Sequence, residues 1–172
     1  MDETPNPIVN VEDEKENQQI FGEHWGATFK SLTPTMRPRG GSLGINHMRV
    51  APGRSTCPFH GHQLEDEAFY ILSGRGVLRY GETLHPLKPG DCVSCPAGTG
   101  IAHQLANPYD EDLVYLAIGA HEPNEVAFYP DNKKILVRGL KKIGWMETAG
   151  YLEGESDPPT IFEMIRSEGG DG

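Results

Sequence analysis

The stretch of sequence that decides the fold is residues 53–74, which read GRSTCPFHGHQLEDEAFYILSG. It places His60 and His62 two positions apart, and Glu67 opens the apolar run that follows. Residues two apart on an extended chain project from the same face. Burying a carboxylate without a partner is costly, and two imidazoles with one carboxylate suit a divalent metal ion. These residues therefore predict a metal site, unless the histidines only cap a loop and Glu67 is solvated.

A second stretch, residues 90–107, reads GDCVSCPAGTGIAHQLAN. Pro96 and Gly98 suit a tight chain reversal, and His103 then lies in an otherwise apolar strand. Such a histidine is either a hydrogen-bonded core residue or a ligand that strand pairing brings to the face of His60 and His62.

Both stretches lie in a region with the pattern of a β-barrel. Short segments rich in Val, Ile, Leu and Tyr recur at 43–50, 67–72, 76–80, 91–95, 101–106 and 113–118, with Gly- and Pro-containing turns between them. This pattern predicts an all-β antiparallel sandwich or barrel over residues 42–120. A further strand is expected at 135–137.

The flanking segments predict an irregular N-terminal arm over 1–41, packed on the barrel, and a C-terminal extension over 121–172. Phe21, Trp25 and Phe29 are spaced by four, which indicates one face of a short helix. A helical turn is also expected within 12–20, and residues 169–172 are expected to fray.

The charge of the chain limits its partners. It has 25 acidic and 15 basic residues, a net charge of −10, with the acids concentrated towards both ends. Nucleic-acid binding needs a clustered basic face, and a membrane span needs about 20 apolar residues, so neither partner is expected. Three cysteines and an N-terminal sequence without an export signal predict a cytoplasmic protein with reduced thiols.

Together the two motifs resemble the cupin superfamily. The first, G-x(5)-H-x-H-x(3,4)-E-x(6)-G, matches from Gly53 to Gly74 with one extra residue before His60. The second, G-x(5)-P-x-G-x(2)-H-x(3)-N, matches from Gly90 to Asn107 with two extra residues before His103. Tyr129, Lys133 and the segment 151–155 are further similar to a group of bacterial single-domain cupins of unassigned activity.

The resemblance implies a double-stranded β-helix, or jelly-roll, barrel. Inside it one divalent metal ion (Fe, Mn, Ni, Zn or Co) would be held by His60, His62, Glu67 and His103. Such a ligand set leaves open coordination positions for an oxygen ligand. The first hypothesis is therefore a metal-dependent enzyme acting on a small oxygenated molecule, of the dioxygenase, isomerase, decarboxylase or lyase type. The alternatives are a non-catalytic small-molecule or metal-binding module, since no general base accompanies the ligands, and a metal that only stiffens the barrel.

Several other side chains are weaker candidates. The residues that could line a pocket, depending on strand register, are His47, Arg49, Gln104 and Tyr115. Cys57 is expected to be a surface thiol, Cys92 and Cys95 to pack on opposite faces of a strand, and Asn107 to fix a turn. His24, His85 and His121 lie beside turns and are expected to be exposed.

The flanks also contain large apolar residues within polar stretches: Ile20, Phe21, Trp25, Phe29, Trp145, Tyr151, Ile161 and Phe162. A short barrel has limited core area and sheet edges that need cover. We therefore expect a homodimer whose contact includes the ends of the chain. The alternative is packing of the ends within one subunit.

Overall fold

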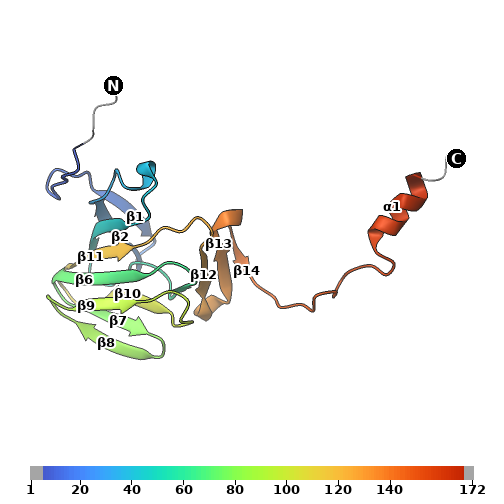
Figure 1. Ribbon diagram of the computed structural model, residues 1–172. Coiled ribbons are helices and arrows are strands. Elements are labelled where there is room, and N and C mark those ends of the chain that lie inside the picture. The colour runs from blue at the N-terminus through green and yellow to red at the C-terminus, as the bar shows by residue number, and fades with distance from the viewer. Residues whose placement is uncertain (1–5, 169–172) are drawn as a thin grey trace, which may run out of the picture.

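The structure, a computed structural model, describes residues 6–168. The fraying expected at 169–172 falls outside these residues. Strands are the predominant regular structure of the described chain, and they form one large curled sheet and one small sheet (Figure 1). The all-β fold class with the curled sheet of a jelly-roll barrel is therefore confirmed.

The large sheet forms the body of the barrel. Its strands, in spatial order, are β8 (Thr83–Leu87), β7 (Gly76–Tyr80), β10 (His103–Asn107), β4 (Arg54–Ser55), β2 (Trp25–Ser31), β3 (Gly44–Val50), β11 (Leu113–Gly119), β6 (Glu67–Ser73) and β9 (Cys92–Cys95), with β1 (Asn17–Phe21) added beside β2. All these pairs are antiparallel except the short contact between β2 and β4.

Alternation along the strands places the core inside this curl. In β6, Phe69 and Ile71 are buried, whereas Tyr70 and Leu72 point to solvent. Ile71 packs in a cluster of fully buried side chains with Val50, Leu105 and Leu113. Period-two burial of this kind is what a sheet with one wet face requires.

The small sheet has the order β14 (Lys142–Trp145), β13 (Lys134–Val137), β12 (Val126–Tyr129) and β5 (Gly61–His62). It stands at one end of the barrel (Figure 1). Because β5 contains His62, this sheet brings the C-terminal part of the chain against the predicted metal site. The short 3-10 helices η2 (Pro130–Asn132) and η3 (Arg138–Leu140) connect its strands.

The helical face predicted from the spacing of Phe21, Trp25 and Phe29 is wrong. These residues lie in the β1–β2 hairpin, in which Phe21 is opposite Trp25. Gly22 adopts a φ of +63° at the reversal, a conformation that glycine adopts without steric cost. The spacing of four reflects pairing across a tight hairpin rather than turns of a helix. Residues 12–20 likewise contain a turn and then β1.

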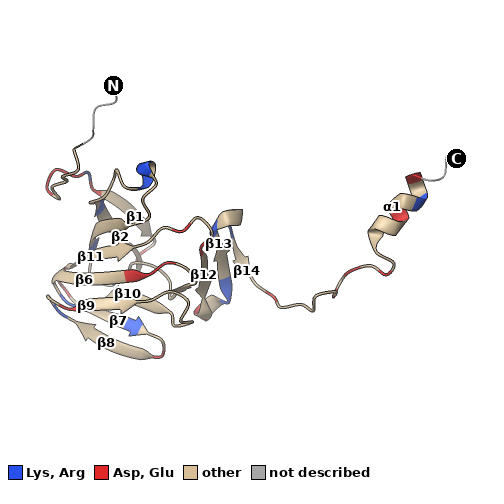
Figure 2. Cartoon of the chain, in the orientation of Figure 1, with Lys and Arg blue, Asp and Glu red and all other residues tan. Residues whose placement is uncertain are grey.

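The last part of the described chain extends away from the barrel (Figure 1). After β14 it continues without regular structure to the helix α1 (Thr160–Glu168), which has no buried residue. No helix in residues 6–168 is long and apolar enough to cross a membrane. Basic residues are scattered over separate segments, including β7, β13 and the 3-10 turn η1 (Arg37–Arg39) (Figure 2).

The hydrogen bonding of the flanks bears on the predicted divisions of the chain. Strands β1 and β2, within the predicted arm 1–41, belong to the large sheet, and β12–β14, within the extension 121–172, form most of the small one. The division at 41/42 and 120/121 stays a prediction.

Candidate metal centre

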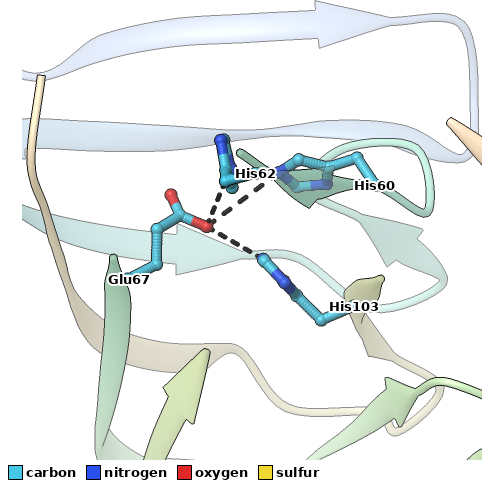
Figure 3. A group of neighbouring side chains, drawn as sticks. All are labelled: His60, His62, Glu67 and His103. Carbon is cyan, nitrogen blue, oxygen red and sulfur yellow. Dashed lines mark hydrogen bonds and ion pairs between the residues drawn. The ribbon is translucent and has the colours of Figure 1, made fainter. Parts of the chain in front are cut away.

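The four residues predicted as metal ligands come from three different parts of the barrel and meet at one place (Figure 3). His62 lies in β5, Glu67 is the first residue of β6 and His103 the first of β10. His60 precedes β5 and forms a two-way backbone bridge with His103, with N–O distances of 3.1 and 2.7 Å. That bridge joins the two sequence motifs directly.

One carboxylate oxygen lies among the three imidazoles. Glu67 Oε2 is 2.8 Å from His103 Nε2, 3.3 Å from His62 Nε2 and 4.0 Å from His60 Nε2 (Figure 3). The four candidate ligand atoms all lie within 4.8 Å of one another. Metal–nitrogen and metal–oxygen bonds are about 2.0–2.2 Å, so a single ion fits this cluster after small side-chain movements.

At His60 and Glu67 the electrostatics favour the forms that bind metals, which are a neutral imidazole and an ionised carboxylate. Burial, with the neighbouring His103, lowers the pKa of His60 to about 4. His60 Nδ1 lies 2.9 Å from the Pro58 carbonyl, which can only accept, so Nδ1 carries the proton and the Nε2 lone pair faces the cluster. Burial alone would raise the pKa of Glu67, but the hydrogen bond from His103 and the close approach of the His62 ring hold it well below its usual range.

The chemistry of His62 provides a test of whether a metal fits. Both of its ring nitrogens are buried, and neither makes a hydrogen bond of acceptable geometry within the described residues, despite the 3.3 Å approach to Glu67. Buried polar atoms are normally satisfied. A cation at Nε2 would satisfy one of the two, so the donor set fits a divalent metal ion.

Glu125 supports His62 from the other side. This glutamate is fully buried and accepts hydrogen bonds from the backbone N–H groups of Gln63 (2.8 Å) and Leu64 (2.9 Å). Its Oε1 lies 3.3 Å from His62 Nδ1. Carboxylates placed behind metal-ligating histidines in this way fix the ring orientation. The sequence pattern gave no indication of Glu125, which lies 58 residues after Glu67 in an irregular segment.

A second missed carboxylate, Glu65, is paired with Arg138 of η3. Two guanidinium nitrogens face its two oxygens, with an Nη2–Oε2 distance of 2.8 Å. The backbone N–H of Glu122 also donates to it at 2.6 Å. Burial opposes ionisation of Glu65, but these hydrogen bonds outweigh burial and lower its pKa. Glu65, His62 and Glu125 form a second cluster of potential metal ligands, which shares His62 with the first cluster.

The metal-site residues open into a cavity of about 470 Å³. Its lining includes His60, His62 and Glu67, together with Ser31, Asn46, His121, Arg138 and the exposed Arg37. Small-molecule sites are commonly cavities of about 300–1,000 Å³. A ligand in this cavity would therefore reach the cluster directly.

The four pocket candidates from the sequence do not line this cavity. On β3 it is Gly44 and Asn46 that face it, so His47 and Arg49 lie on the other side of the sheet, where Arg49 pairs with Asp112 at 3.1 Å. The Gln104 and Tyr115 side chains are engaged elsewhere, Gln104 with the Cys57 carbonyl at 3.0 Å and Tyr115 within the core.

Of three further expectations from the sequence, one is confirmed and two are wrong. Asn107 fixes a turn as expected, through hydrogen bonds to the carbonyls of Val50 and Glu111. Cys57 is not a surface thiol: it is half-buried, its Sγ is 3.6 Å from His60 Nδ1, and burial raises its pKa to about 11. His121 is half-buried and lines the cavity, whereas exposure was expected.

Comparisons with known proteins agree with this geometry. Residues 46–119 match the family described as the cupin domain. The chain therefore contains a cupin domain, which is the class that the curled sheet and the two motifs indicate.

Two curated proteins are similar to parts of this chain. One is an oxalate-binding protein of Thermotoga maritima, 37% identical over 71 residues, which cover 41% of this chain and 56% of that protein. The other is auxin-binding protein 1 of Arabidopsis thaliana, 33% identical over 117 residues, which cover 53% of this chain and 58% of that protein. The matches thus span somewhat more than half the length of each relative.

Solved structures match over more of the chain. A crystal structure from Acidithiobacillus ferrooxidans, named provisionally as a sugar phosphate isomerase, has a TM-score of 0.67 and 27% identity, and covers 80% of this chain and 90% of that one. A sugar phosphate isomerase from a cupin superfamily, of Silicibacter pomeroyi, has a TM-score of 0.64 and 25% identity, with 74% and 83% covered.

Proposed function

We propose that His60, His62, Glu67 and His103 hold one divalent metal ion and that the chain is a metal-dependent enzyme acting on a small oxygenated molecule. The observation that carries the proposal is the cluster itself: three imidazoles and one ionised carboxylate, with their ligand atoms within 4.8 Å, at the inner end of a cavity. Nitrogen and oxygen donors suit Fe, Mn, Ni, Zn or Co.

The residues around the cluster have separate tasks in this proposal. His60 is aimed by its Nδ1–H bond to Pro58, and His62 is backed by Glu125. The barrel wall keeps His103 out of solvent, with 2% of its surface exposed. A bound metal would supply Lewis-acid polarisation of a ligand oxygen, or redox chemistry if it is iron.

The names of the similar structures favour an isomerase among the reaction types considered, since two of them are described as sugar phosphate isomerases. The second candidate is a non-catalytic binding module. It is favoured by the two curated relatives, both of which are named for what they bind. Turnover of a ligand that binds at the metal would separate the two functions.

We also propose that the chain works as a cytoplasmic homodimer. Its three cysteines are all free thiols, which suits a reducing compartment. Tyr151, Leu152 and the apolar side chains of α1 are all exposed in the single chain. A second copy of the chain would give them a surface to cover.

The test is metal binding by the wild-type chain and by His103→Ala, measured by elemental analysis and by calorimetric titration with Mn²⁺. Loss of one of four ligands should lower the affinity more than about 100-fold, beyond the loss typical of an outer-shell residue. Gln104→Ala, the next residue on the same strand and on its other face, is the matched control and should bind as the wild type does. Full metal occupancy in His103→Ala would show that His103 is a core histidine. A substrate screen with and without air would then separate turnover from binding.

A further inference from the structure

We infer that the outer part of the metal-site cavity binds the terminal anionic group, phosphate or carboxylate, of the ligand, and that Arg37 is the principal cation for it. The inference rests on the proposed function, because it takes the other end of the same ligand to lie at the metal cluster. It makes the ligand a bifunctional anion rather than a neutral oxygenated molecule.

Arg37 is placed for this task by η1, the short turn between β2 and β3. Its side chain lines the same cavity as His60, His62 and Glu67. Within residues 6–168, no salt bridge joins Arg37 to a carboxylate. An arginine that lines a cavity with its hydrogen-bond donors unpaired is well suited to a two-pronged contact with phosphate or carboxylate.

His121 offers a second donor at the same end of the cavity. Its Nδ1 lies 3.1 Å from Arg138 Nη1, and a guanidinium can only donate. Nδ1 must therefore accept, which leaves the proton on Nε2 as a free donor. Both side chains line the same cavity. Burial and then the charge of Arg37 lower the pKa of His121, which favours the neutral ring.

Between the two ends, the wall of the cavity is polar. Ser31 of β2 and Asn46 of β3 are direct partners across the sheet, and both line the cavity. Neither side chain makes a hydrogen bond within residues 6–168; the side-chain hydrogen bonds of β2 and β3 come from other residues. Hydroxyl or carbonyl groups in the middle of a ligand would find free partners there.

The balance of charge in the cavity also favours an anion. Glu65 is neutralised by Arg138, and the two charges of a divalent ion would balance Glu67 and the Glu125 behind His62, so the charge of Arg37 remains uncompensated. This is a local positive site in a chain whose net charge is −10. A cavity that presents one sign of charge raises the local concentration of ligands of the opposite charge.

The experiment uses calorimetric titration of the full-length, Mn²⁺-loaded chain with two matched pairs of probes. Ribose 5-phosphate is compared with ribose, and 2-oxoglutarate with 2-oxobutyrate, so that the members of each pair differ by one distal anionic group. The variants are Arg37→Gln, Arg37→Lys and, as the matched control, Arg39→Gln, which changes an arginine of the same turn that does not line the cavity.

In at least one pair, the wild type should bind the member with the distal anion more tightly, by about tenfold or more, the worth of a charge-assisted contact. Whichever pair shows the preference identifies the anion as phosphate or carboxylate. Arg37→Gln should remove most of the preference without weakening the uncharged partner, Arg37→Lys should keep part of it, and Arg39→Gln should keep all of it. Absence of a preference in both pairs, or equal losses in Arg37→Gln and Arg39→Gln, would overturn the inference.

Metal content and titrations of the metal-free chain separate this inference from the proposed function. If the wild type takes up no Mn²⁺, the proposed function fails. The preference for the anionic probe, and its loss in Arg37→Gln, are then measured without metal and decide on the Arg37 site alone. If Mn²⁺ binds but no anion preference exists, only the inference about Arg37 fails.

Discussion

His62 is the residue with the greatest number of ionisable neighbours in the site. Glu67 faces one ring nitrogen, and Glu125 and Glu65 face the other at 3.3 and 3.7 Å. Burial opposes protonation of this ring, yet the carboxylates outweigh it and raise its pKa. A cation at Nε2 would replace the proton that the carboxylates favour. Metal affinity should therefore depend on the carboxylates that face Nδ1, which are those of Glu125 and Glu65.

That dependence gives a prediction for Glu125→Gln. The amide keeps one oxygen to accept a backbone N–H bond but loses the charge behind His62 Nδ1. Metal affinity should fall about 10- to 100-fold, as for other outer carboxylates of metal sites. Mn²⁺ titration checks the loss. Glu111→Gln, at an exposed surface glutamate, is the control. Equal affinities of Glu125→Gln and the wild type, with folding intact, would show that Glu125 serves only the backbone of Gln63 and Leu64.

Among the individual site residues, the sequence predicts only those that belong to a motif with fixed spacing. The residues His60, His62, Glu67 and His103 belong to two ordered motifs, and the structure brings them together. Arg37 and Arg138 reach the cavity, and Glu125 reaches the far side of His62, through tertiary folding of segments without a motif. Periodicity contains no signal for them, because their positions depend on how the small sheet and η1 dock against the barrel.

Among the elements, the barrel strands follow from alternation and turns, and most predicted segments coincide with β3, β6, β7, β9, β10 and β11. β8 was missed because Pro86 interrupts it. Proline is tolerated in edge strands, and β8 pairs only with β7 at the end of the sheet. The hairpin β1–β2 was missed because its aromatic spacing also fits a helix. The helix α1 was missed although Ile161, Phe162 and Ile165 have a helical spacing.

The junction between the barrel and the small sheet depends on Arg138 and Glu65. Arg138→Met should destabilise the fold by about 2–3 kcal/mol, at the lower end for a broken buried pair, because the Arg138 side chain is 29% exposed. Urea unfolding of the metal-free chains checks the value. The double variant Arg138→Met/Glu65→Gln should lose less free energy of unfolding than Arg138→Met alone, because it leaves no buried charge unpaired.

The same pair predicts a dependence on pH. In the wild type the lowered pKa of Glu65 contributes stability that is present above its unfolded value, near 4.5, and is lost as pH falls through the folded value. Without Arg138, burial still opposes ionisation while the largest opposing contribution is gone, so the pKa of Glu65 is lowered less and the variant gains less stability as pH rises. The stability difference between wild type and Arg138→Met should therefore be largest near pH 7 and shrink towards pH 4. A difference that is constant over this range would contradict the account.

For the whole molecule, the question is what covers the extended C-terminal end. Tyr151 and Leu152 are 97% and 71% exposed, and the apolar residues of α1 lie free of the barrel (Figure 1). The alternative of packing within one subunit is not what the chain adopts for this segment. The apolar N-terminal residues Phe21 and Trp25 lie in the β1–β2 hairpin of the large sheet, and they too are exposed, at 69% and 42%.

We therefore predict a homodimer in which α1 contributes to the contact. Sedimentation velocity of the full-length chain at micromolar concentration should give twice the subunit mass of 18.9 kDa. Phe162→Glu/Ile165→Glu should shift the mass to that of the monomer, since charges would enter an apolar contact. Glu163→Gln, on the same helix, should leave the dimer unchanged. A monomeric wild type would refute the prediction, and a dimer that survives the double substitution would exclude α1 from the interface.

The measurement that tests the central claim most directly is the X-ray absorption spectrum of the Zn²⁺-loaded full-length chain, together with its metal content. The account predicts one metal ion per chain, bound only by nitrogen and oxygen at about 2.0–2.2 Å, with the multiple-scattering signature of three imidazoles. Sulfur at about 2.3 Å would place the ion at Cys57 instead. Either that result or a spectrum without imidazole scattering would contradict the assignment of His60, His62, Glu67 and His103 as the metal site.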